Sequence, residues 1–159
     1  MNIYLIRHGD AEKAAIGKKD FDRDLTQSGR LKIKVAASGW KNFIASFDYI
    51  VSSPLIRALN TAKIIAEEYN FKKEIVIDKK LAPGSKTENL IEIANSLNYE
   101  DVAFVGHQPD MSEHLSNLIS GNWANIDFKK GAIAKVSFNN KAHPSKGVLE
   151  FLIPAGTFK

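Results

Sequence analysis

The chain has 159 residues, of which 44% are hydrophobic and 25% charged, as in one globular domain with a single core. It contains no cysteine, which excludes a disulfide framework, a thiolate metal site and a cysteine nucleophile. The formal net charge of +4 favours anionic partners only weakly, because the lysine pairs are scattered rather than clustered. We see no signal peptide and no apolar stretch near the ~20 residues of a membrane helix. We therefore expect one cytoplasmic domain over residues 1–159.

The first half of the chain predicts two strands, each followed by a helix. In chain order these elements are a strand at 2–7, a polar loop at 8–25, a helix capped by Thr26, a strand at 48–52 and a helix capped by Ser53. Apolar residues recur at helical spacing behind each capping side chain, and Pro54 suits the first position of the second helix. The strands are apolar nearly throughout, which is typical of strands covered on both faces.

The second half continues the alternation and then changes it. Its expected elements are a strand at 74–78, a helix capped by Thr87, a strand at 102–105, a helix behind the capping box Asp110–Glu113, and strands at 132–138 and 148–153. The last two strands have no helix between them and should pair as an antiparallel hairpin. The pattern predicts an α/β fold, a three-layer αβα sandwich whose central sheet is mostly parallel with an antiparallel edge.

Basic side chains follow three of the predicted strands. Arg7 and His8 end the first strand before Gly9, Arg57 lies in the Ser-Pro-x-x-Arg segment after the second, and His107 lies in a Gly-His-x-Pro segment after the strand at 102–105. Because the carboxyl ends of parallel strands meet at one edge of a sheet, we expect these side chains to converge. Guanidinium groups match the geometry of phosphate, so the pattern predicts a phosphate site.

His8 is the candidate nucleophile of this site. A neutral imidazole nitrogen can attack phosphorus if the other ring nitrogen carries the proton and is fixed by a carbonyl group. Arg7 and Arg57 would hold the phosphate oxygens, and His107 would bind a further oxygen and stabilise charge in the transition state. Gly9 lets the backbone pass close to the bound group. Each residue alone has a plainer reading as a loop or surface residue, and it is the joint pattern that favours a site.

Five motifs, spread over nearly the whole chain, form a recognisable set. They are, in order, Ile6–Ala11, Arg23–Gly29, Ser52–Ala62, Val105–Pro109 and Gly131–Ala134. The set resembles the histidine phosphatase superfamily, in the branch that contains the phosphoglycerate mutases, and more narrowly its small SixA-type phosphohistidine phosphatases. The resemblance implies a phosphoglycerate mutase-like fold. It also implies that His8 becomes phosphorylated in a pocket that includes Arg7, Arg57 and His107.

The resemblance also places Arg23 near the rim of the pocket. An ion pair of Arg23 with Asp20, Asp22 or Asp24 explains this arginine equally well, so both interpretations stay open.

One departure from the family bears on the substrate. The mutases and many small-molecule phosphatases of this family carry a glutamate general acid and a larger cap after the third strand. In this chain the stretch 75–90 is short, and its only acids, Asp78 and Glu88, match no motif. A pocket without a cap suits a bulky substrate, and an imidazole leaving group needs less protonation than an alkoxide. Asp10 or Glu12 remains a candidate proton donor from the first loop.

We therefore expect a metal-independent phosphatase that works through a phosphohistidine at His8 on a phosphohistidine protein, such as a phosphotransfer domain of a signalling relay. The alternatives are a phosphomonoesterase for a small sugar phosphate or nucleotide-derived ester, and a non-catalytic module that binds phosphate or nucleic acid. We expect no cofactor, no metal site, no nucleic-acid partner and no membrane partner. The oligomeric state is open, with a monomer among the options. His114 and His143 are expected to be ordinary surface or boundary residues.

Overall fold

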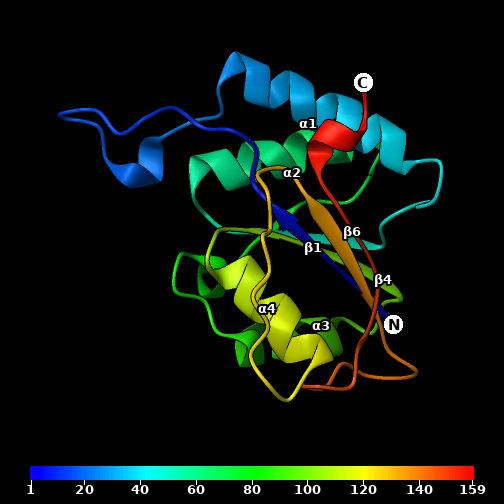
Figure 1. The fold of residues 1–159 in the computed structure, drawn as a ribbon. Coiled ribbons are helices and arrows are strands. Elements are labelled where there is room, and N and C mark those ends of the chain that lie inside the picture. Colours follow the sequence, from blue (N-terminus) through cyan, green and yellow to red (C-terminus); the bar gives the residue numbers. More distant parts are fainter.

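A six-stranded sheet lies between two layers of helices in the computed structural model, which describes residues 1–159 (Figure 1). The strands are β1 (Asn2–Arg7), β2 (Tyr49–Ser52), β3 (Val76–Ile77), β4 (Asp101–Gly106), β5 (Ile133–Ser137) and β6 (Val148–Ile153). The helices are α1 (Gln27–Trp40), α2 (Ile56–Glu68), α3 (Thr87–Leu97) and α4 (Asp110–Ile119), with short 3-10 turns η1 (Asp20–Asp22), η2 (Lys79–Leu81) and η3 (Ala155–Thr157). No helix combines the length and the apolar character that crossing a membrane requires.

The order of the strands in the sheet is β3-β2-β4-β1-β5-β6. The first four strands run parallel to one another, β5 pairs antiparallel with β1, and β6 pairs antiparallel with β5. The expected mostly parallel sheet with an antiparallel edge is thus confirmed. In the register of β1 and β4, Arg7 lies opposite Gly106. The residues that follow these two strands therefore leave the sheet side by side.

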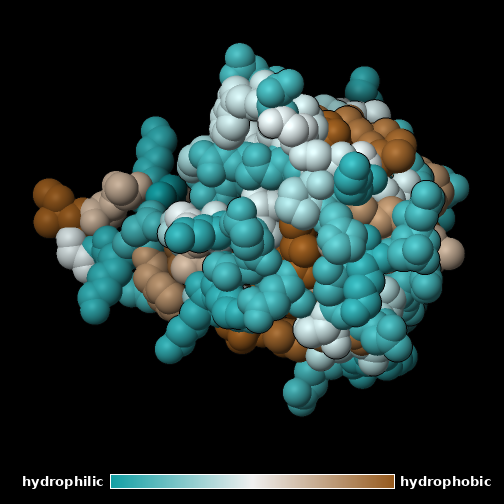
Figure 2. Space-filling view, turned by 90° about the horizontal axis from the view of Figure 1, so that it is seen from below, coloured by the Kyte–Doolittle hydropathy of each residue, from teal (hydrophilic) through white to brown (hydrophobic).

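Hydrophobic side chains fill both faces of the sheet, which explains the nearly unbroken apolar strands. Ile3 and Leu5 of β1 belong to the core shared with α3 and α4, whereas Tyr4 and Ile6 belong to the core shared with α1 and α2. Successive strand residues point to opposite faces, so only a strand covered on both sides is apolar at every position. The face of the molecule seen in Figure 2 is mostly hydrophilic, with scattered apolar patches.

The predicted helix starts are right in one case and displaced in the others. Thr26 caps α1, since its hydroxyl accepts a hydrogen bond of 2.9 Å from the backbone N–H of Gly29. By contrast, α2 begins at Ile56, and the Ser53 hydroxyl lies within hydrogen-bond distance of a histidine ring instead of capping the helix. Thr87 and Asp110 are the first residues of their helices and provide no side-chain cap. Tertiary hydrogen bonds engage all three side chains, and the Ser53 hydroxyl also accepts a bond of 3.3 Å from the backbone N–H of Leu55.

The start of α1 depends on close backbone contact with the loop that follows β1. A Cβ atom at Gly29 would lie 2.3 Å from the carbonyl oxygen of Asp10, a backbone atom that cannot move without shifting the loop. We expect Gly29→Ala to lower the free energy of unfolding by about 1–3 kcal/mol in urea denaturation. Ser28→Ala, at the exposed neighbouring position, should change it by less than ~0.5 kcal/mol. Equal stabilities of the two variants would contradict this account of the contact.

Candidate active site

The structure brings His8, Arg57 and His107 together at the carboxyl ends of the parallel strands. His8 and His107 are the first residues after β1 and β4, and Arg57 lies in the first turn of α2. Their exposed fractions are only 8%, 6% and 2%, so all three side chains are largely withdrawn from water. The two imidazole rings lie 5.2 Å apart, centroid to centroid.

The hydrogen bonds of His8 fix its tautomer. Its Nδ1 lies 2.7 Å from the carbonyl oxygen of Gly9, which can only accept, so Nδ1 carries the proton. Its Nε2 accepts a hydrogen bond of 3.3 Å from Nε of Arg57. Burial lowers the pKa of His8 to about 4, and the positive charges of Arg57 and Arg7 act in the same direction. The ring is therefore neutral near pH 7, with the lone pair of Nε2 directed to the Arg57 guanidinium.

His107 is held by a serine that the sequence analysis assigned to another role. The Ser53 hydroxyl lies 2.7 Å from Nε2 of His107, whereas Nδ1 of the same ring is buried and has no hydrogen-bond partner. Burial lowers the pKa of His107 to about 3, with further contributions from His8 and Arg57. Ser53 follows β2 directly, as the two histidines follow their own strands. Its position directly after a parallel strand is the feature of the sequence that could have identified Ser53 as part of the site.

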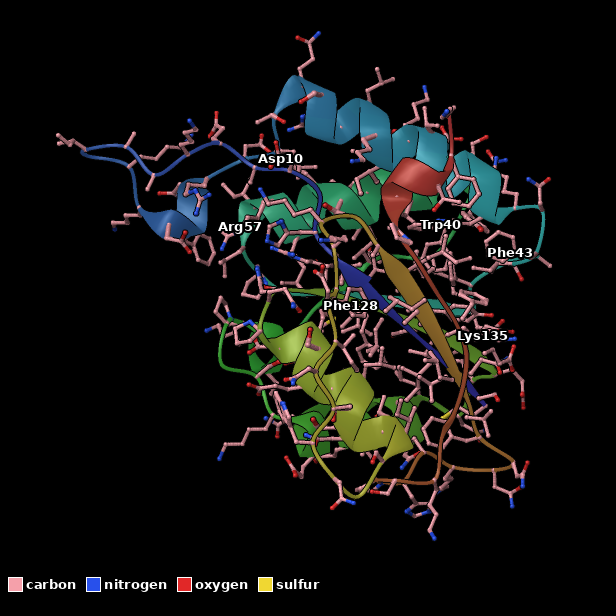
Figure 3. The ribbon with its side chains drawn as sticks, in the orientation of Figure 1. Asp10, Trp40, Phe43, Arg57, Phe128 and Lys135 are labelled. Carbon is pink, nitrogen blue, oxygen red and sulfur yellow. The ribbon has the colours of Figure 1, made fainter.

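Arg7 is anchored by the segment that precedes β5. Its Nη1 donates a hydrogen bond of 2.8 Å to the carbonyl oxygen of Phe128, while its Nε is buried without a partner. The backbone N–H of Gly131 lies 3.1 Å from the carbonyl oxygens of both Arg7 and His8. Figure 3 shows Arg57 and Phe128 near the carboxyl end of β1. Burial lowers the pKa of Arg7, so desolvation opposes its charge.

Gly9 and Thr61 connect the first loop to α2. The backbone N–H of Gly9 donates a hydrogen bond of 3.1 Å to the Thr61 hydroxyl, which donates one of 2.8 Å to the carbonyl oxygen of Arg57. A Cβ atom at Gly9 would lie 2.8 Å from Cγ1 of Ile33. The absence of a side chain at Gly9 therefore allows the loop to pack against α1 next to the site.

Arg23 forms an ion pair with Asp20, which also contacts Arg57. The expected ion pair therefore lies next to the site, where the resemblance placed the rim of the pocket. Its Nη1 donates a hydrogen bond of 2.8 Å to Oδ1 of Asp20, and Oδ2 of Asp20 accepts one of 3.0 Å from Nη2 of Arg57. Asp20 thus bridges the two arginines, a role that the sequence analysis did not assign to it.

The candidate proton donors of the first loop are both paired with lysines. Asp10 forms an ion pair with Lys130, and Glu12 forms one with Lys18. The hydrogen bond from Lys130 lowers the pKa of Asp10, and that from Lys18 lowers the pKa of Glu12. Both carboxyl groups are therefore ionised near neutral pH. No group of three or more His, Cys, Asp or Glu side chains is placed to hold a metal ion.

The prediction that His114 is a surface or boundary residue is wrong. The side chain is fully buried in α4, with Nε2 at 2.8 Å from the Ser85 hydroxyl and Nδ1 at 2.9 Å from the Thr87 hydroxyl. These bonds fasten the loop before α3 to α4, and burial lowers the pKa of His114 to about 4. His143, in contrast, is exposed as expected.

The three buried histidines predict a loss of stability on acidification. Their pKa values in the folded state are about 4 for His8, about 3 for His107 and about 4 for His114, below the ~6.5 of an unfolded chain. Between about pH 6.5 and pH 4 the unfolded chain binds protons that the folded chain does not. As the pH is lowered through this range, the free energy of unfolding should therefore decrease by up to ~1.4 kcal/mol per pH unit for each histidine.

Urea denaturation at about pH 7 and about pH 5 measures this dependence. The loss should be smaller in His114→Gln, which removes one of the three titrating rings. It should be unchanged in His143→Gln, which removes an exposed ring. Equal stability of the unaltered protein at the two pH values would contradict the burial of neutral rings.

Comparison of the chain with known proteins identifies its family. A profile of the histidine phosphatase superfamily (branch 1) matches residues 3–110. An uncharacterized protein of Picosynechococcus is 32% identical over 137 residues, which are 84% of this chain and 82% of that protein. The mitochondrial serine/threonine-protein phosphatase Pgam5 of Drosophila ananassae is 31% identical over 77 residues, 48% of this chain. The stretch covers only 26% of that protein's own length.

Solved structures show the same fold over the whole chain. The protein histidine phosphatase SixA complexed with tungstate has a TM-score of 0.87 at 21% identity, with 99% of both chains covered. The putative phosphohistidine phosphatase SixA from Agrobacterium tumefaciens has a TM-score of 0.82 at 25% identity, with 96% of this chain and 97% of that chain covered. The expected phosphoglycerate mutase-like fold is thereby confirmed. Since the family profile spans more than half of the sequence, the chain belongs to the histidine phosphatase superfamily and is a phosphatase.

Proposed function

We propose that this phosphatase works through a covalent phosphohistidine at His8 and that its substrate is a phosphohistidine on another protein. The observation that carries the proposal is the tautomer of His8. Its Nδ1 proton is bound to the Gly9 carbonyl, so the lone pair of Nε2 is free of a proton next to Arg57. A neutral imidazole with a fixed, unprotonated nitrogen is the form that attacks phosphorus.

The reaction has two steps on the same nitrogen. Nε2 of His8 attacks phosphorus in line while the bond from phosphorus to the substrate's imidazole breaks. The other nitrogen of that ring carries a proton taken from solvent, so the electron pair leaves on a neutral imidazole. Water then attacks the phosphorus of phosphorylated His8, and inorganic phosphate and the neutral ring are released. The protein contributes mainly position and charge, as is general for phosphoryl transfer.

Two buried donors without protein partners suit the oxygens of the phosphoryl group. These are Nε of Arg7 and Nδ1 of His107, which belong to residues at the ends of the adjacent strands β1 and β4. A buried polar group without a partner is costly, and a bound anion would remove that cost. The negative charge of the anion would also raise the pKa of His107, so that the ring can donate to an oxygen from either nitrogen.

The lack of an obvious general acid favours a phosphohistidine over an alkyl phosphate. Asp10 and Glu12 are ionised and paired with lysines. Between β3 and α3 the chain forms only the short turn η2 and a loop, which leaves no room for the larger cap of other family members. Imidazole leaves with less protonation than an alkoxide, and a site without a cap suits a bulky substrate. The likeness to the SixA structures supports the same substrate class.

His8→Asn should abolish turnover of both a phosphohistidine protein and a generic aryl phosphate. We expect a loss of at least about a thousandfold in kcat/KM, because the variant removes the attacking nitrogen. Rapid acid-free quenching with a labelled substrate should trap a base-stable, acid-labile phosphoryl group on the unaltered enzyme and none on the variant. His143→Asn, at the exposed histidine, should retain both activities.

Retained turnover in His8→Asn would contradict the nucleophile. Efficient turnover of small esters together with none of the phosphohistidine protein would instead assign the site to a small-molecule phosphomonoesterase.

Ser53→Ala tests whether the hydroxyl orients His107. We expect kcat/KM to fall about tenfold, which corresponds to the loss of one buried hydrogen bond. Ser85→Ala is the matched control, because it removes the same type of bond, at 2.8 Å from Nε2 of His114, outside the site. The control should lower stability and leave kcat/KM unchanged. Equal effects of the two variants on kcat/KM would contradict a specific role for Ser53.

A further inference from the structure

A projecting segment of the chain, residues 12–24, lies beside the site and is called the arm below. Figure 1 shows it in blue, extending from the body of the domain, and Figure 2 shows the same projection from another side. An antiparallel bridge between Ala11 and Leu25 closes its base, and residues 13–22 are all exposed. Within that exposed stretch, Asp20 alone forms hydrogen bonds to the rest of the domain, and both go to Arg57.

Asp20 occupies the terminal nitrogens of the Arg57 guanidinium. Nη1 donates a hydrogen bond of 2.8 Å to the carbonyl oxygen of Asp20, and Nη2 donates one of 3.0 Å to its Oδ2. The third nitrogen, Nε, donates to His8. The side chain of Arg57 is 7% exposed and that of Asp20 is 60% exposed. An exposed carboxylate therefore faces a buried guanidinium, as a phosphate would.

Phosphate and Asp20 exclude each other from the same nitrogens, because the backbone carbonyl of Asp20 holds Nη1 and its carboxylate holds Nη2. A phosphate that bound Nη1 and Nη2 would have to displace Asp20, and one that left Asp20 in place would lie beside its negative charge. Both alternatives reduce the affinity for the anion. The hydrogen bond from Arg23, followed by that from Arg57, holds the pKa of Asp20 below its usual range, so the competing group is charged near neutral pH.

We propose that Asp20 is an intramolecular competitor for the phosphate pocket, which weakens the binding of inorganic phosphate and so favours release of the product. The inference rests on the proposed function, because that function assigns Arg57 to the phosphoryl group. A substrate gains contacts through the group that carries its phosphoryl, whereas free phosphate has only the pocket. The carboxylate lowers the affinity for both, and free phosphate, which has no other contacts, is then weakly bound.

The test is calorimetric titration of inorganic phosphate into the full chain at constant ionic strength. Asp20→Asn keeps the size of the side chain and removes its charge. Asp22→Asn is the matched control, because Asp22 lies in the same η1 turn, is exposed and forms no ion pair. We expect Asp20→Asn to bind phosphate at least about threefold more tightly than the unaltered protein, and Asp22→Asn to bind it equally well. Asp20→Ala should change the affinity in the same direction.

The direction of the change in phosphate affinity shows whether Asp20 competes with phosphate or only positions Arg57. If Asp20 only positioned Arg57, both Asp20 variants would bind phosphate less tightly, and weaker or equal binding would overturn the inference. The inhibition constant of phosphate against turnover should fall by the same factor as the dissociation constant. No binding of phosphate by either the unaltered protein or Asp20→Asn would overturn the proposed function itself.

Discussion

The parallel pairing of β1 with β4 determines where the chemistry of this protein is placed. The register sets Arg7 beside Gly106, so that His8 and His107 emerge together at one edge of the sheet. Because side chains alternate between the faces of a strand, a slip of one residue would turn one imidazole to the opposite face. Both faces are apolar, so it is the close fit of individual side chains in the two cores that opposes that slip. The same packing that stabilises the sheet thus positions the two rings.

The fold holds a cluster of positive groups away from water without enough negative charge to balance them. Two guanidinium groups lie near two imidazole rings, and burial with these charges keeps both rings neutral. Carbonyl oxygens fill part of the need for acceptors, as Phe128 does for Arg7 and Gly9 does for His8. A dianion supplies what carbonyl groups lack, which is net negative charge. The proposed affinity for phosphate rests on this excess of positive over negative groups.

Sequence reasoning predicted the layers, the antiparallel edge and the strand ends at which His8, Arg57 and His107 converge, because these depend on long apolar runs and their ends. It failed where a polar side chain has one local and one distant partner. Thr26 caps its own helix, but Ser53 and Thr87 bond to histidines far along the chain. Burial of His114 depends on the hydroxyls of Ser85 and Thr87, and the place of Asp20 depends on how the arm folds back. Neither leaves a periodic pattern in the sequence.

The hydrogen bonds that hold the loop before α3 against α4 limit how the length of this loop can change in evolution. Besides the bonds to His114, the carboxylate of Asp110 accepts hydrogen bonds from the backbone N–H groups of Gly84 and Ser85, at 2.9 Å and 3.2 Å. Lengthening this loop would strip a fully interior imidazole and a buried carboxylate of their partners at once. An insertion in this loop would therefore lower stability, so the chain can vary in length more easily at loops that hold no such bonds.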